Sequence, residues 1–138
     1  MKLTLIGGGG VRSPLFVTTL LRWQKRVGVD ELCLLDIDER KLSIFGPLCR
    51  ELVRRAGSPF KVTVTMDARA ALNGADHVVT TIRPGFEQGR VTDERIALRH
   101  GVLGQETTGP GGFAMALRSI PVLLGYVRLL KEVSPKAW

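Results

Sequence analysis

The sequence contains few of the residues on which several functional classes depend. Its two cysteines, Cys33 and Cys49, form no C-x-x-C pair, which argues against a disulfide framework or a zinc ribbon. Aromatic residues make up 6% of the chain, too few for a platform that stacks nucleic-acid bases. No apolar run approaches the ~20 residues of a membrane span, and KLTLI is too short for a signal peptide. We therefore expect a cytoplasmic protein without a membrane partner.

Several catalytic motifs are also missing. The chain has no H-E-x-x-H, no G-x-S-x-G and no lysine after its glycine run, which excludes a zinc protease, an α/β-hydrolase and a P-loop NTPase. His77 and His100 are isolated, and a lone histidine is more often structural than a ligand. The sequence therefore offers no catalytic set and no metal site of its own.

Positive charge is abundant. The net charge is +7 and the isoelectric point is about 10.1, values that also occur in nucleic-acid-binding domains. The basic residues are scattered over several predicted helices, as in RWQKR and CRELVRR, so we favour solvated helix faces and predict no specific nucleic-acid partner. Some of the arginines remain available for an anionic small molecule.

Strand-like and helix-like patterns alternate along the chain. Short apolar runs predict strands at 2–6, 31–37, 61–66 and 77–82. Helical patterns cover 14–27, 39–56, 68–74, 87–99 and 113–133. Ser13 is the expected N-cap of the first helix, and Pro47 predicts a kink or a restart in the second. Ile44, Leu48 and Leu52 share one face of that second helix and are its predicted apolar face.

This alternation predicts an α/β fold with parallel strands joined by right-handed crossovers. We expect a doubly wound, Rossmann-like sheet of order 3-2-1-4 in a single domain spanning residues 1–138. A further strand is due after the last helix, so we interpret the chain as the N-terminal part of a longer enzyme, truncated after the helix that follows strand 4.

A glycine loop separates the first strand from the first helix, the position at which such folds bind a dinucleotide pyrophosphate. The loop, Gly7-Gly8-Gly9-Gly10-Val11-Arg12-Ser13, departs from a clean G-x-G-x-x-G and is a weak signal by itself. Asp36, at the end of the second strand, strengthens it, because its carboxylate can accept both ribose hydroxyls of NAD and repels a 2′-phosphate. Arg40 lies just beyond and leaves some tolerance of NADP conceivable.

A second dense stretch covers residues 80–113 and leaves the carboxyl end of the fourth strand, where doubly wound sheets bind ligands. It holds three arginines, Arg83, Arg90 and Arg95, and the polar run Gln105–Thr108. Arginines there suit a phosphate or carboxylate of a substrate. The alternative is a surface helix with internal ion pairs, which we favour for Arg95 and Arg99, while spacing alone does not decide for Arg90.

The stretches IGGGG…SP, LLDID, TTIRPG, GRVTDERIALRHG and above all GQETTGPGGF resemble the N-terminal region of glycoside hydrolase family 4, and within it the 6-phospho-β-glucosidases. The resemblance covers essentially the whole chain. It implies hydrolysis of phosphorylated glucosides with NAD and a divalent metal such as manganese. The mechanism that the resemblance implies is that NAD would oxidise carbon 3 of the sugar, a tyrosine base assisted by the metal would remove the carbon 2 proton, the aglycone would be eliminated, water would add and hydride would return.

The resemblance also assigns roles to residues. Gly7, Gly8, Gly9 and Gly10, with Val11 and Arg12, would hold the pyrophosphate, and Asp36 the adenosine ribose. Thr81, Ile82, Arg83 and Pro84 would line the cofactor, and Arg90, Gln105, Glu106 and Thr107 would border the phosphosugar. Many members have serine at the position of Gly10. The metal-binding cysteine and histidine and the tyrosine base of the family lie beyond residue 138, and Tyr126, inside the last predicted helix, is a poor substitute.

We therefore expect this chain to be inactive alone and the enzyme to be a homo-oligomer. The unpaired edge of the fourth strand or the apolar last helix is expected to make the chain self-associate. Two alternatives remain: an NAD-dependent 2-hydroxy acid dehydrogenase of the lactate and malate type, and a non-enzymatic nucleotide- or nucleic-acid-binding module. Oxidation of 2-hydroxy acids would favour the former, and salt-sensitive duplex binding the latter.

Overall fold

The computed structural model describes residues 1–138, and the contacts divide the chain into two units. The first unit comprises Met1–Thr81 and Leu129–Trp138, and the second comprises Ile82–Arg128. The glycine loop and Asp36 lie in the first unit. The arginines of the second dense stretch lie in the second unit.

The first unit is built on a four-stranded parallel sheet. Its strands are β1 (Lys2–Ile6), β2 (Glu31–Leu35), β3 (Lys61–Thr65) and β4 (His77–Thr80), in the spatial order β3-β2-β1-β4. Leu5 of β1 lies opposite Leu34 of β2 and Val79 of β4, so the three strands end at the same edge. The predicted order 3-2-1-4 and the Rossmann-like fold class are confirmed.

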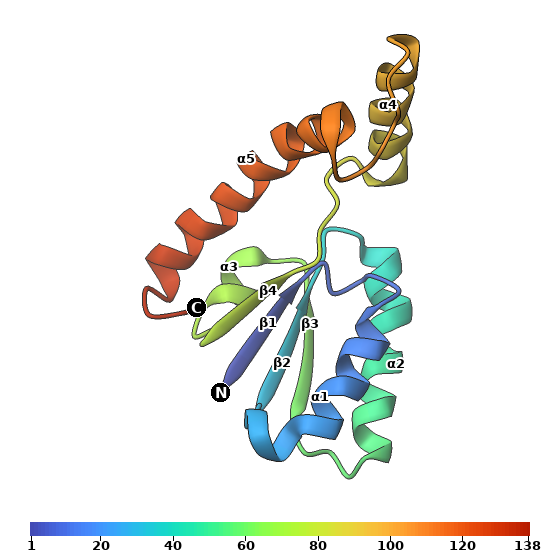
Figure 1. Ribbon diagram of the computed structural model, residues 1–138. Helices are drawn as coiled ribbons and strands as arrows, with labels where there is room; N and C mark the ends of the chain where they lie inside the picture. The colour runs from blue at the N-terminus through green and yellow to red at the C-terminus, as the bar shows by residue number, and fades with distance from the viewer. The chain divides into compact units, whose positions relative to one another are not determined.

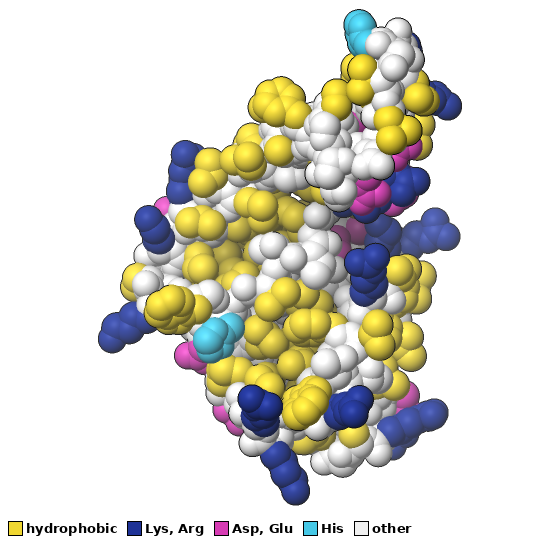
Figure 2. Space-filling model, viewed as in Figure 1, with side chains coloured by type: hydrophobic (Ala, Val, Ile, Leu, Met, Phe, Trp, Pro, Cys, Tyr) yellow, Lys and Arg dark blue, Asp and Glu magenta, His cyan; other side chains and the backbone are white.

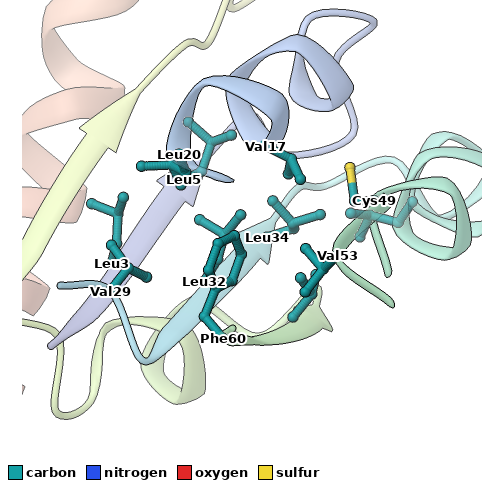
Figure 3. Packing of buried hydrophobic residues seen from close by; sticks show 12 residues of the cluster. Leu3, Leu5, Val17, Leu20, Val29, Leu32, Leu34, Cys49, Val53 and Phe60 are labelled. Carbon is teal, nitrogen blue, oxygen red and sulfur yellow. The ribbon is translucent and has the colours of Figure 1, made fainter. Parts of the chain in front are cut away.

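Helices cover both faces of this sheet (Figure 1). The helices α1 (Ser13–Val27) and α2 (Glu39–Arg55) lie on one face, and the short α3 (Ala68–Leu72) lies on the other. Right-handed crossovers explain this, because the chain steps outward from β1 to β3 and then back to β4. The core lies between the sheet and α1 and α2, where Val17 and Cys49 belong to the same buried cluster as Leu5 and Leu34 of the sheet (Figure 3).

Helix α1 starts differently from the prediction. Its N-cap is Arg12, with no side-chain cap, and Ser13 is its first helical residue, with 2% of its surface exposed. The N–H of Ser13 donates to the carbonyl of Gly10, and the N–H of Phe16 donates to that of Arg12. The glycine turn thus leads directly into the helix, which already includes Ser13, so the prediction of Ser13 as N-cap is wrong.

The buried face of α2 also differs from the prediction. Ile44 and Leu48 are 56% and 44% exposed, whereas Leu52 is half-buried and packs against the core. The buried positions follow the spacing i, i+4, i+7 and i+11, at Leu42, Gly46, Cys49 and Val53. A Cβ on Gly46 would lie 2.9 Å from Val64, so the glycine lets α2 approach β3 and sets which face turns inward. The helix continues through Pro47 in one piece, so a restart there is wrong.

The last residue of the chain lies against the free edge of β4. The N–H of Trp138 donates to the backbone carbonyl of Asp76 at 2.9 Å, and the carbonyl of Trp138 accepts the N–H of Val78 at 2.7 Å. These two bonds are the parallel-ladder pattern that sets Trp138 opposite His77. Ser134 anchors the end of the chain beside the sheet, since its hydroxyl donates to the carbonyl of Leu72 at the end of α3.

The second unit contains α4 (Phe86–Arg99) and most of α5 (Gly109–Val133), which begin earlier than the predicted positions 87 and 113. An 18-residue stretch of α5 has a mean hydropathy of 1.5 and no buried residue. By length and composition α5 could cross a membrane, so the expectation that no apolar stretch approaches the length of a membrane span is wrong. The core helix of a soluble protein meets the same criterion. Figure 2 shows hydrophobic side chains exposed over α5.

Candidate functional site

The glycine loop is held against the end of β2. The N–H groups of Gly7 and Gly8 both donate to the carbonyl of Leu35, at 2.8 and 2.9 Å, and Gly10 donates back to Gly7 at 3.0 Å. Gly7 has a φ of +91°, and a Cβ on it would lie 2.8 Å from Oγ1 of Thr81. The loop therefore needs glycine at this turn for both its backbone angle and its contact with the end of β4.

The next two glycines are required by close approach. A Cβ on Gly8 would lie 2.7 Å from Cβ of Leu34, and one on Gly9 would lie 2.9 Å from Oδ2 of Asp36 and 3.0 Å from Cβ of Lys41. Two chain segments thus cross with only hydrogen atoms between them. The N–H groups of Gly7, Gly8, Gly9 and Gly10 all donate within the chain, so the amides left open to a phosphate are those of Val11 and Arg12 at the start of α1.

Asp36 ties this loop to the chain that follows β2. Its Oδ2 accepts the N–H of Gly9 at 2.8 Å, and its Oδ1 accepts the N–H of Asp38 at 3.1 Å. Asp38 in turn caps α2 by accepting the N–H of Lys41 at 3.0 Å. The half-buried carboxylate of Asp36 is thereby fixed at the mouth of the loop, with lone pairs left to accept hydroxyl groups.

The other predicted cofactor residues lie around this loop or follow it in the chain. Val11 and Arg12 are exposed at the start of α1. Thr81 follows β4, and its hydroxyl donates to the carbonyl of Ile6 at 3.2 Å. Ile82, Arg83 and Pro84 continue directly from Thr81 and belong to the second unit. Backbone amides, a helix N-terminus and a carboxylate together suit a ligand with an anionic group and a diol.

The second unit brings two of the predicted arginines onto one carboxylate. Both Arg83 and Arg90 donate to Glu106, Arg83 to Oε1 and Arg90 to Oε2, the latter at 3.3 Å. Arg83 also pairs with Glu87 at 2.6 Å. The Nε of Arg90 is buried without a hydrogen bond, although the carboxylates of Glu87 and Glu94 lie within 3.3 and 3.5 Å of it. The cluster thus alternates fixed positive charges with carboxylates.

The rest of the predicted substrate-bordering loop is arranged differently. Gln105 and Thr107 are exposed, and neither side chain bonds to the arginine cluster. Gln105 accepts the hydroxyl of Thr108 instead. Glycines bring this loop close to the start of α5, because a Cβ on Gly111 would overlap the carbonyl oxygen of Gln105. Of the four residues predicted to border the substrate, the structure brings Arg90 and Glu106 into contact, whereas Gln105 and Thr107 do not bond to them.

One ion pair of the second unit was not predicted from the sequence. Arg118 binds both carboxylate oxygens of Asp93, at 2.9 and 2.6 Å, and the Asp93 side chain is 7% exposed. The hydrogen bonds from Arg118 lower the pKa of Asp93 below its ordinary value. A signal was present, because Arg118 is the one charged residue between Phe113 and Val127 of an apolar segment. A lone charge in such a segment requires a partner.

The chain has no group of three or more histidine, cysteine or acidic side chains placed to hold a metal ion. Burial raises the pKa of Cys33 and raises that of Cys49 to about 11. Both thiols lie in the first unit within or beside the apolar core, so neither is available as a thiolate ligand at neutral pH.

The chain resembles known proteins over its whole length. The sequence model of family 4 glycosyl hydrolases matches residues 2–138. A probable 6-phospho-beta-glucosidase of Bacillus subtilis is 44% identical over 100% of this chain and 32% of that protein, and a 6-phospho-beta-glucosidase of Escherichia coli is 41% identical over 100% and 31%. The chain therefore spans about a third of the length of these relatives.

A solved structure shows the same likeness in three dimensions. The 6-phospho-beta glucosidase of Thermotoga maritima, determined with NAD and glucose-6-phosphate, matches with a TM-score of 0.91 at 39% identity. The match covers 97% of this chain and 32% of that one.

Proposed function

The chain belongs to family 4 of the glycosyl hydrolases, and from that premise we propose that it is the NAD-binding N-terminal part of a 6-phospho-β-glucosidase. The observation that carries the cofactor assignment is the loop of Gly7–Gly10, whose packing leaves no room for a Cβ at Gly8 or Gly9 and which is bonded to Asp36. The Thermotoga relative, whose structure contains NAD, has the same fold over this region.

In this proposal the turn of Gly7–Gly10 shapes the pyrophosphate site, and the N–H groups of Val11 and Arg12 at the start of α1, which have no partner within the chain, bind the pyrophosphate. Asp36 accepts the hydroxyls of the adenosine ribose and disfavours a 2′-phosphate. Thr81, Ile82, Arg83 and Pro84 line the rest of the cofactor. When bound, NAD supplies a hydride acceptor and donor for the sugar, and the protein's task is to place and orient the two reactants.

Residues of the second unit are assigned to the phosphorylated sugar. Arg90 and Glu106 border it, together with the Gln105 and Thr107 positions of the same loop. The Arg83–Glu106–Arg90 cluster brings two guanidinium groups together, and in this proposal the phosphate replaces a carboxylate such as Glu106 on them, because both arginines are paired with glutamates. The resemblance implies that the tyrosine base and the metal ligands of the family lie beyond residue 138, so we propose that residues 1–138 alone are inactive.

Family membership also weakens the two alternatives. A lactate- or malate-type dehydrogenase shares the sheet but does not account for GQETTGPGGF, which lies within the matched residues. Nucleic-acid binding rests on net charge alone. A homo-oligomeric, cytoplasmic enzyme remains our proposal on the resemblance.

Calorimetric titration of the purified chain tests the cofactor assignment. We expect NAD to bind more tightly than NADP, and Asp36→Asn to weaken NAD binding by about tenfold, which corresponds to about 1.4 kcal/mol. Glu39→Gln removes the same charge from the exposed first turn of α2 and should leave NAD affinity unchanged. Equal loss in both variants, or no NAD binding by the wild-type chain, would contradict the assignment.

A chimera tests the activity. Residues 1–138 would replace the matching third of the Escherichia coli relative, and hydrolysis of 6-phospho-β- and 6-phospho-α-glucosides would be measured with NAD, manganese and a reductant. We expect turnover of the β-linked substrate by the chimera and none by residues 1–138 alone. Oxidation of 2-hydroxy acids without glycoside hydrolysis would favour the dehydrogenase alternative instead.

A further inference from the structure

The guanidinium of Arg118 connects two parts of the second unit. Its two terminal nitrogens bind Asp93 of α4, and its Nε donates to the carbonyl of Pro84 at 2.7 Å. One side chain of α5 therefore holds both the body of α4 and the turn that precedes it. Arginine suits this task, since its planar fork offers several donors in a fixed geometry.

The residues around Arg118 leave room for this side chain. A Cβ on Gly85 would lie 2.9 Å from Nε of Arg118, and one on Gly89 would lie 3.0 Å from its Cζ. Both glycines therefore let the guanidinium lie directly against the backbone of the turn and of the first turn of α4.

The turn itself adopts an unfavourable backbone. Gly85 has a φ of +81°, and Phe86, which has a side chain, has a φ of +50°. A residue other than glycine persists in this region only where its surroundings hold it. The bond from Arg118 to Pro84, together with that from the N–H of Phe86 to Arg83, supplies that restraint.

The same turn carries Arg83, whose guanidinium binds Glu106 and Glu87. Arg118 has no bond to either of those carboxylates. We propose that Arg118 is a positioning residue that fixes the Arg83–Phe86 turn through Pro84 and Asp93, and so sets where Arg83 meets Glu106. The proposal rests on the proposed function only for the identity of the ligand, a sugar phosphate.

The test compares Arg118→Gln, Arg118→Lys and Asp93→Asn with Arg128→Gln, a matched control on the same helix at an exposed position without an ion pair. Guanidinium N–H resonances of Arg83, assigned through Arg83→Lys, are measured at a temperature at which circular dichroism shows each variant folded. We expect the distinct resonances of the paired Arg83 to collapse to those of a free arginine in Arg118→Gln, to change partly in Arg118→Lys, and to stay unchanged in Arg128→Gln.

Binding of glucose 6-phosphate in the presence of NAD is the second readout. We expect Arg118→Gln to weaken it by about tenfold. A purely structural role would lower the melting temperature without moving the Arg83 resonances of the folded protein, and that result would overturn the proposal. If Arg118→Gln does not fold, Arg118→Lys and Asp93→Asn decide by the same resonances. Failure of the wild-type chain to bind glucose 6-phosphate would count against the proposed function, while the resonances still decide the role of Arg118.

Discussion

The backbone N–H of Gly9 donates to Oδ2 of Asp36 across 2.8 Å, and this bond joins the two features that the sequence places 27 positions apart. It makes the carboxylate part of the loop's own structure as well as a group at its mouth. A ligand that contacts both the start of α1, which follows the loop, and this carboxylate finds their spacing already set, which lowers the ordering cost of binding.

Gly9→Ala is expected to weaken NAD binding by about tenfold or more, because the new methyl group would lie 2.9 Å from Asp36 and 3.0 Å from Lys41 and would push the loop away from both. Titration calorimetry measures this. Gly125→Ala is the control, since a Cβ at Gly125 in α5 meets nothing within 4 Å. It should leave NAD affinity unchanged and stabilise the helix by about 0.5–1 kcal/mol. Equal NAD affinity of the two variants would contradict the close approach at Gly9.

The Asp93–Arg118 pair predicts a dependence of stability on acidity. The pKa of Asp93 in the folded chain is below its unfolded value of about 3.9, so the pair stabilises the folded state above that value. This stabilisation is lost as the pH falls through the folded pKa. We expect the melting temperature of the wild type to fall more steeply below about pH 4 than that of Asp93→Asn, which lacks the titrating group. Parallel curves for the two proteins would show that the pair contributes nothing.

The two thiols are expected to be inert in the folded chain. Burial raises the pKa of Cys33 and brings that of Cys49 to about 11, which leaves almost no thiolate at neutral pH. Iodoacetamide treatment at pH 8 followed by mass spectrometry should show no labelling of the native protein and double labelling in guanidinium chloride. Rapid labelling of Cys49 in the native protein would contradict its placement in the core.

Self-association of residues 1–138 is expected through exposed apolar side chains of α5 or through the edge of β4. Leu117→Lys tests the first surface, because Leu117 is 61% exposed. Thr80→Pro tests the second by removing an N–H on the edge side of β4, two positions beyond the Val78 group that bonds to Trp138. Light scattering should show that one variant shifts the chain toward monomer. A monomeric wild type at high concentration would contradict the expectation.

Sequence patterns predicted the sheet because parallel strands that are covered on both faces must be apolar throughout, as LCLL of β2 is. Sequence patterns were less informative about features that depend on how closely two segments approach each other. The inward face of α2 follows from Gly46 against Val64, and the start of α1 follows from the bond between Ser13 and Gly10. Neither contact leaves a repeating pattern in the sequence from which it could have been predicted.

The sequence by itself determined the strand order, the glycine loop with Asp36 after the next strand, and the family. These depend on local pattern and on short motifs, in which neighbouring residues carry the information. Only the tertiary structure decided that Arg83 and Arg90 share Glu106 and that Arg118 holds Asp93 and Pro84. Such pairs join residues that are distant in the chain, and side-chain geometry in space selects among many possible partners of the same charge.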